Sequence, residues 1–117
     1  LQQVAVKLFF ARVGLDMTPV QFAALAAVAH RPRIDQARLS ALIGYDRATI
    51  GGVIGRLESR GWLARSASPA DRRVRLVRIT PSGRKALARA LPAVRAVQQT
   101  LLESLDADSS YLTPTEY

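Results

Sequence analysis

The chain has 117 residues, 49% of them hydrophobic, which suits a single domain with a substantial core. It contains no cysteine, and this excludes disulfides, thiolate zinc sites and cysteine redox sensing. Its 17 basic and 9 acidic residues give a net charge of +8, and 15 of the basic residues are arginine, which favours forked contacts with phosphate or guanine.

No membrane segment is expected, because no apolar run approaches the roughly 20 residues of a membrane span. No signal peptide is recognised either, so we expect a cytoplasmic protein without a membrane partner. An enzyme would need a nucleophile, a base or a metal cluster. With one histidine and scattered acids the sequence offers none, so we predict no catalytic residue, no metal site and no cofactor.

Two apolar helices are predicted at the start of the chain. Residues 1–13 carry an apolar stripe wider than the first helix of a small monomer needs, so we assign residues 1–16 to a dimerisation helix. Residues 18–21 form a capping box with proline at the first helical position, which opens a helix from Pro19 to about His30. Because this helix is almost entirely alanine, valine, leucine and phenylalanine, we expect it to be buried on most sides.

A short helix is predicted next, from Gln36 to Ile43, with Asp35 as its N-cap and Gly44 just past its end. Its inward face is assigned to three apolar residues, Leu39, Leu42 and Ile43. Only a tight turn then separates it from a second helix. Two short helices joined in this way are typical of a helix-turn-helix, in which the second helix reads the DNA.

The second helix is predicted to begin after Asp46 and to be closed by Gly61. Its inward face is apolar at helical spacing, with Ile50, Val53, Ile54 and Leu57. The opposite face carries small residues, namely Ala48, Gly52, Gly55 and Ser59, flanked by Thr49, Gly51 and Arg56. Interior glycines cost about 1 kcal/mol each relative to alanine, so their gathering here favours close approach to bases in a major groove. The alternative is a surface helix of poor propensity.

A β-hairpin wing is predicted after this helix. Residues 62–66 and 74–79 have strand patterns, and the turn-rich segment 67–73 between them carries Arg72 and Arg73 at the tip. Between residues 60 and 95 there are ten basic residues and a single acid, Asp71. The tip is therefore expected either to contact DNA or to be a solvated charged turn.

A long final helix is predicted over residues 81–105, opened by Thr80 and Pro81 and bent at Pro92. Its apolar positions form a seam of Leu87, Leu91, Val94, Leu101, Leu102 and Leu105. One small domain offers little to cover this seam, so we expect a partner helix from a second copy, and hence a homodimer. Residues 106–117 are predicted to be an irregular tail, either truncated or joined across a gap.

In order and spacing, six segments resemble the MarR family of winged helix-turn-helix transcription regulators, over roughly residues 8–105. They are LDMTPVQF (15–22), LSALIG (39–44), DRATI (46–50), RLESRGWL (56–63), DRR (71–73) and ITPSG (79–83). The resemblance implies a mainly α fold with a small β-hairpin wing, in which residues 17–80 form the winged DNA-binding domain and the first and last helices form the dimer. Gly51 and Gly52 depart from the serine or threonine and arginine frequent in the family, so base readout is not carried over there.

The resemblance also implies a function. The chain is expected to bind a near-palindromic operator in double-stranded DNA as a homodimer, and to release it when a small aromatic acid or phenol binds. The rival interpretation is a winged-helix nucleic-acid-binding protein without ligand sensing, which acts through architecture or protein contacts.

The expected DNA contacts come from three parts of the chain. They are Gln36, Arg47, Ala48, Thr49, Gly52, Arg56, Asp71, Arg72, Arg73 and Arg75. We expect Gln36 to present backbone N–H groups to a phosphate. The acid of the wing, Asp71, matches the family residue that holds Arg73 for the minor groove.

The expected ligand site is an aromatic-acid pocket lined by Phe9, Phe10, Phe22 and Arg12, with Arg12 pairing the carboxylate. His30 is a further candidate for a ligand contact. Each residue also has a structural alternative. The phenylalanines can simply be core, and His30, at a helix end, can serve the helix dipole.

Overall fold

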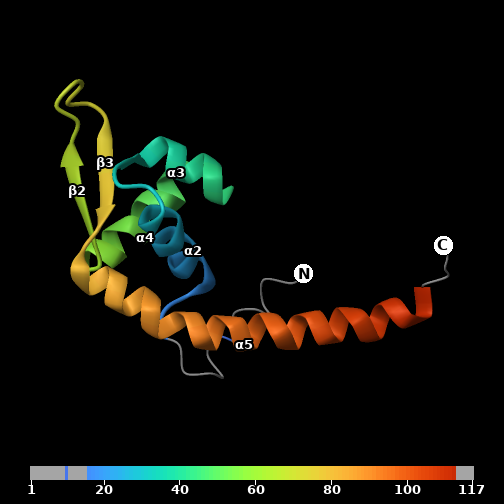
Figure 1. The fold of residues 1–117 in the computed structure, drawn as a ribbon. Coiled ribbons are helices and arrows are strands. Elements are labelled where there is room, and N and C mark those ends of the chain that lie inside the picture. Colours follow the sequence, from blue (N-terminus) through green and yellow to red (C-terminus); the bar gives the residue numbers. More distant parts are fainter. Residues whose placement is uncertain (1–9, 11–15, 113–117) are drawn as a thin grey trace.

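The computed structural model describes residue 10 and residues 16–112. The elements in chain order are α2 (Pro19–Ala29), β1 (Ile34–Asp35), α3 (Gln36–Ile43), α4 (Arg47–Ser59), β2 (Leu63–Ala67), β3 (Arg75–Ile79) and α5 (Pro81–Leu112). Figure 1 shows α2, α3, α4 and the β2–β3 hairpin gathered into a head, from which α5 extends as a long arm. The predicted helix over residues 1–13 lies outside the described residues, except for Phe10, which is helical.

Side-chain caps begin the three helices of the head, as the sequence predicts. In the capping box of α2, Thr18 Oγ1 accepts from the backbone N–H of Gln21 at 3.2 Å, and Gln21 Oε1 accepts from that of Thr18 at 3.0 Å. Asp35 caps α3 and Asp46 caps α4, each with an oxygen 2.7 Å from a backbone nitrogen. These caps satisfy amides that the helical ladder leaves without partners.

Two glycines end the helices of the helix-turn-helix. Gly44 (φ +86°) and Gly61 (φ +77°) both adopt the left-handed conformation, which costs a residue without a side chain little. The backbone N–H groups of Gly61 and Trp62 then bond back to the carbonyls of Glu58 and Leu57. The chain can therefore reverse sharply into the wing directly after α4.

The core lies under α2 and α4. Ile50, Ile54 and Leu57 of α4 are fully buried and Val53 nearly so, which confirms the predicted inward face. The middle of α2 is buried too, and α2 contacts α3, α4, α5 and β3. The prediction of a central α2 is therefore confirmed, although several of its flanking side chains remain half-buried.

The wing belongs to a three-stranded antiparallel sheet in the order β1-β3-β2. The predicted hairpin pairs Leu63 with Ile79 at its base and Ala67 with Arg75 near its tip. The sequence did not predict β1, in which Ile34 pairs with Val77. Two residues are too few to show strand alternation, and Asp35 reads first as a helix cap. Through β1 the wing is attached to the start of α3.

Arg60 and Trp62 stabilise the packing of the head at the end of α4. The Arg60 guanidinium stacks 4.0 Å from the centre of the Trp62 ring and pairs with the carboxylate of Asp16, just before α2. This cation–π contact and ion pair join the start of α2 to the end of α4. Arg60, part of the basic stretch in the sequence, therefore serves the fold.

The predicted inward position of Leu42 is wrong, because this residue is 53% exposed. Helix α3 packs through Leu39 and Ser40, which are buried, and through the half-buried Ile43. The predicted inward face assumed that every leucine faces the core. Because Ser40 occupies the inward position, Leu42 is turned outward.

Helix α5 packs through smaller residues than predicted. Its buried ridge consists of Ala86, Ala90, Val94 and Val97. Of the predicted seam, Val94 is buried, Leu87 and Leu91 are half-buried, and Leu102 is 56% exposed, while the side chains of Leu101 and Leu105 lie outside the description. Alanines let the helix approach the core closely, and a search for large apolar residues overlooks them.

The predicted end of α5 near residue 105 is also wrong, since the helix continues to Leu112. Residues 106–112 are mostly polar but contain neither glycine nor proline, and an existing helix propagates readily through such a stretch. Figure 1 shows the axis of α5 bending along its length, as expected for a helix that contains Pro92. No helix among the described residues is long and apolar enough to span a membrane.

Candidate nucleic-acid interface

The outward face of α4 is open, as predicted. Ala48, Gly52 and Arg56 are exposed, and a Cβ added at Gly52 would meet no atom within 4 Å. Arg47 at the start of the helix is exposed too. A surface of small residues can approach a second surface closely. The arginines beside it are long enough to contact groups on that second surface.

Thr49 has a second role that the sequence did not suggest. Its hydroxyl donates to Asp46 Oδ2 at 3.1 Å, and its backbone N–H donates to Asp46 Oδ1 at 2.7 Å. These hydrogen bonds lower the pKa of the Asp46 carboxyl below its ordinary value, because they favour the charged form. Thr49 is therefore fixed by the cap, and its hydroxyl oxygen remains available as an acceptor.

The other two glycines of α4, Gly51 and Gly55, face side chains from α3 and β2 instead of open space. A Cβ at Gly51 would lie 3.4 Å from Gln36 Nε2, and one at Gly55 would lie 3.7 Å from Arg65 Nη2. Of the three glycines predicted to serve close approach to DNA, only Gly52 therefore faces open space. The other two leave room for side chains that arrive from α3 and β2.

We call the set Gln36, Glu58 and Arg65 the brace. Arg65 donates through Nε and Nη2 to Glu58 Oε1, at 3.2 and 2.9 Å, and through Nη1 to Gln36 Oε1 at 3.5 Å. The brace joins α3, α4 and the wing, and the side chains of Arg65 and Glu58 are 29% and 39% exposed. Sequence reasoning missed it, since nothing in the local pattern shows that β2 runs back beside α4.

Gln36 is placed differently from the prediction. Its side chain is engaged by Arg65, and the amides expected to receive a phosphate are partly occupied. Asp35 Oδ1 already accepts from the backbone N–H of Ala37 at 2.7 Å and of Arg38 at 3.4 Å. The start of α3 therefore offers a phosphate fewer free backbone N–H groups than an uncapped helix does. The negatively charged carboxylate of Asp35 also lies beside these groups.

The predicted pairing of Asp71 with Arg73 is present at the wing tip. Arg73 donates through Nε to Asp71 Oδ1 at 3.2 Å, and its backbone N–H donates to the same oxygen at 3.1 Å. These bonds lower the pKa of the Asp71 carboxyl. The Arg73 side chain is nevertheless 90% exposed, so the acid fixes its direction and leaves it accessible. Arg72 and Arg75 are exposed as well.

A basic groove brings several predicted residues together. A hollow of about 260 Å³ opens between the start of α4, the start of α3 and the wing. Arg47, Arg73 and Arg75 line it together with Gln36, and Asp35 is its one carboxylate. We call this hollow the basic groove. Its three guanidinium groups come from two separate elements, which is the arrangement expected for a phosphate backbone that passes between a helix and a wing.

The predicted ligand residues are only partly described. Phe10 is 5% exposed and meets Phe22 edge to face, with ring centres 6.4 Å apart. Phe22 is half-buried, and His30 is exposed at the C-cap of α2. Phe9 and Arg12 lie outside the described residues. The two described phenylalanines therefore belong to the core or its margin.

The sequence profile of the MarR family matches residues 15–74, more than half of the chain. The chain belongs to the MarR family. The transcriptional regulator HosA from Escherichia coli is 35% identical over 97 residues, which cover 83% of this chain and 72% of HosA. This MarR-family chain is therefore a transcriptional regulator of the MarR type.

Two solved MarR-type structures show the same winged-helix fold. The PcaV regulator from Streptomyces coelicolor, in complex with its natural ligand, has a TM-score of 0.85 and 32% identity, over 94% of this chain and 79% of PcaV. BpsR from Bordetella bronchiseptica, whose DNA binding is regulated by 6-hydroxynicotinic acid, has a TM-score of 0.76 and 33% identity, over 84% and 71% of the two chains. The predicted family and fold class are thereby confirmed.

Proposed function

We propose that this chain acts as a homodimeric repressor that binds a near-palindromic operator in double-stranded DNA and leaves it when a small aromatic acid or phenol binds. The basic groove carries this proposal. It places Arg47 of α4 beside Arg73 and Arg75 of the wing, so that one phosphate backbone can contact both elements.

The two DNA-binding elements have different tasks in this proposal. The outward face of α4 enters the major groove, where Ala48 and Gly52 allow close approach and Arg56 reaches a base or a phosphate. Exposed wing arginines, above all Arg73, contact the minor groove or phosphates. Sequence preference then comes from α4, and most of the electrostatic affinity comes from the wing and the groove.

A second copy of the chain gives the two-fold symmetry that matches a near-palindromic operator. Helix α5 extends well beyond the head in Figure 1, and Leu102 on that extension is exposed. Two heads held apart by paired α5 helices would contact two half-sites, which explains the expected near-palindromic operator.

Release by an aromatic acid is supported by BpsR, whose DNA binding 6-hydroxynicotinic acid regulates. In this chain the corresponding proposal places the ligand beside Phe10, Phe22 and His30, between the dimerisation region and the head, with Phe9 and Arg12 completing the site. One observation favours the alternative of a regulator without ligand sensing. Phe10 is buried and already packs against Phe22, which leaves little open space between these two rings.

Selection from a random DNA pool, followed by anisotropy titration of the selected duplex, tests the DNA-binding part. We expect an enriched inverted repeat that is bound far more tightly than random DNA of equal length. A pool without an enriched sequence would overturn the proposal. The release part is tested separately, by adding aromatic acids and phenols to the preformed complex. Release by one of them supports sensing, and release by none supports the alternative.

A further inference from the structure

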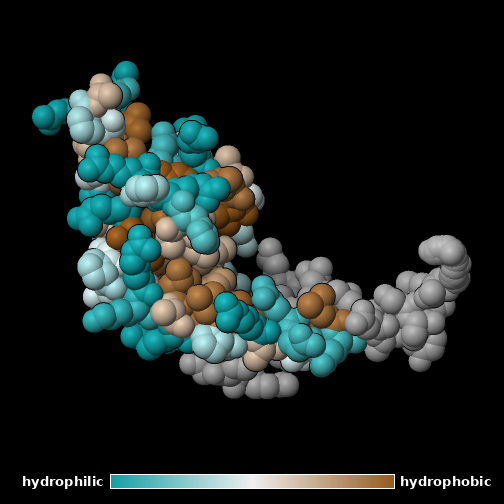
Figure 2. All heavy atoms as spheres, in the orientation of Figure 1, coloured by the Kyte–Doolittle hydropathy of each residue, from teal (hydrophilic) through white to brown (hydrophobic). Residues whose placement is uncertain are grey.

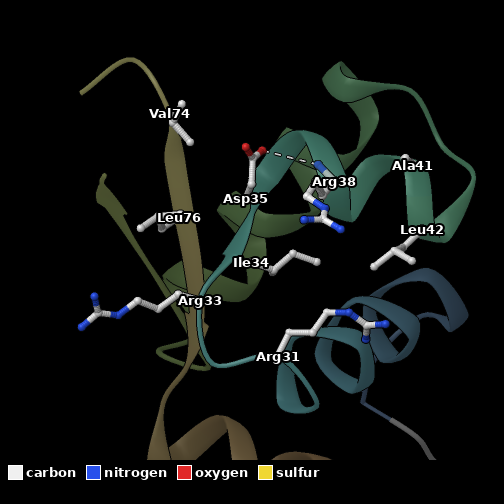
Figure 3. Close-up of a pocket in the computed structure, with 9 residues that line it drawn as sticks. All are labelled: Arg31, Arg33, Ile34, Asp35, Arg38, Ala41, Leu42, Val74 and Leu76. Carbon is white, nitrogen blue, oxygen red and sulfur yellow. Dashed lines mark hydrogen bonds between the residues drawn. The ribbon is translucent and has the colours of Figure 1, made fainter. Parts of the chain in front are cut away.

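A second, larger cavity lies on the head, next to the basic groove, with which it shares Asp35 and Val74. It has a volume of about 570 Å³ and opens between the end of α2, the outer side of α3 and strand β3. Figure 3 shows it with its lining side chains, and Figure 2 shows apolar surface beside α3 bordered by hydrophilic side chains. Its volume lies within the range of small-molecule sites. None of the DNA contacts proposed above uses it.

The electrostatics of this cavity favour an anion. Three arginines line it, Arg31, Arg33 and Arg38, against a single carboxylate, Asp35. That carboxylate already accepts two backbone N–H groups as the cap of α3, so it is directed towards its own helix. In Figure 3, Arg38 and Arg31 extend on the same side as Leu42, whereas Arg33 points away past β3. Arg31 spends one donor on the carbonyl of Ala27, and its other donors remain available.

An apolar wall faces these charges. Leu42 is 53% exposed, one of few large apolar side chains with so much surface among the described residues. It stands beside the buried Ile34, and the half-buried Leu76 of β3 also lines the cavity. Exposed leucine surface in water is unfavourable by about 25 cal/mol per Å², so this wall gains from an apolar occupant.

We propose that this cavity is a second ligand site, which binds a small organic anion with a carboxylate on an apolar body. The carboxylate lies between the guanidinium groups of Arg38 and Arg31, and the apolar body lies against Leu42 and Ile34. Arginine suits this role because its planar fork can hold both carboxylate oxygens. The site is distinct from the Phe10–Phe22 region, and it does not depend on the proposed repressor function.

Calorimetric titration of the full chain with benzoate, without DNA, tests this site directly. We expect saturable binding that Arg38→Ala weakens by about tenfold or more, because one charged hydrogen-bonding partner is removed. Leu42→Ser should weaken it roughly threefold to tenfold, because the ring would then cover less apolar surface. Both residues are exposed, so the variants should fold, which their circular dichroism and melting curves will verify. Arg89→Ala on α5 is the matched control and should bind like the parent.

Benzyl alcohol and acetate separate the two halves of the recognition. The alcohol keeps the ring without the charge and acetate keeps the charge without the ring, so both should bind much more weakly than benzoate. Benzoate titrations of Arg38→Ala and Leu42→Ser that match the parent in affinity and in number of sites would overturn the proposal, because all of the bound ligand would then lie elsewhere. Absence of saturable binding up to about 10 mM, where ΔG would be only about −3 kcal/mol, would overturn it as well. Neither result bears on whether the chain binds an operator.

Discussion

A side chain at residue 83 has no room, because the backbone of Trp62 occupies its place. A Cβ built on Gly83 would lie 2.1 Å from the Trp62 carbonyl oxygen. The same oxygen accepts from the backbone N–H of Thr80 at 3.0 Å, and Thr80 Oγ1 accepts from that of Gly83 at 3.0 Å. The first turn of α5 is therefore pressed directly onto the chain that leaves α4.

Replacement of Gly83 by alanine should consequently destabilise the protein. The clash is with backbone, which cannot rotate away, so we expect the free energy of unfolding to fall by at least about 1–3 kcal/mol. Urea denaturation measures it. Gly52→Ala is the matched control, since it adds the same methyl group where nothing lies within 4 Å. Equal stability of the two variants would contradict the close approach of Gly83 to Trp62.

Gly52 itself gives the sharpest test of the reading helix. Alanine there should raise helix propensity by up to about 1 kcal/mol, so stability should hold or rise. Operator affinity should nevertheless fall for Gly52→Ala, and fall further for Gly52→Val, because the added bulk separates α4 from the groove. Binding to random DNA should change much less. If melting and titration show that both variants bind the operator like the parent, α4 does not approach DNA closely.

Substitutions of Arg73 and Arg56 should affect DNA binding in different ways. Arg73→Ala should weaken binding to all DNA sequences nearly alike and reduce the salt slope by about one for each phosphate that the variant no longer neutralises in a half-site. Arg56→Ala, if this residue reads a base, should cost about 1–3 kcal/mol and relax preference at one operator position. Titrations over a range of salt, on the operator and on random DNA, compare them. Identical behaviour would refute the division between wing and helix.

The cap of α4 should be pH-dependent. The pKa of Asp46 is lowered in the folded protein, so its contribution to stability is present above the unfolded value and is lost as pH falls through the folded one. Asp46→Ala should therefore melt at a lower temperature than the parent at neutral pH. That gap should stay constant on acidification until about pH 4 and close below it. A gap that remains unchanged at the lowest measurable pH would show that the charged form is not what stabilises the cap.

The chain should be a dimer in solution at micromolar concentration. The motivation is the extension of α5 beyond the head and the exposure of Leu102 on it. Light scattering reports the mass directly, and Leu102→Lys should lower it towards one chain of 12.7 kDa if this position lies in the interface. A monomer mass for the parent would contradict the prediction.

The sequence predicts those parts of the fold that are encoded locally. Asp46 as a cap, Gly61 as a helix end and the buried face from Ile50 to Leu57 follow from spacing alone, and the structure has them all. The Asp71–Arg73 pair is also local and was predicted, in this case through the family resemblance. Each of these features involves residues only a few positions apart.

Features made by distant residues were missed or misplaced. Strand β1 is defined only by its pairing with β3, and the brace joins Gln36 to Arg65 across 29 positions. Leu42 has the apolar character of a core residue, but its exposure depends on which side of α3 the other helices occupy. Local patterns carry no information on such choices, because tertiary packing makes them.

The three faces of α4 imply that this regulator can change its preferred DNA without losing its fold. One face is core, the second carries Gly51 and Gly55 against the brace, and on the third a Cβ added at Gly52 would meet no atom within 4 Å in the described part of the chain. Substitutions on the third face should alter recognition while stability stays nearly constant. Descendants of one ancestral gene could therefore acquire new target promoters by drift at a few exposed positions, and a laboratory library confined to those positions should contain mostly folded proteins.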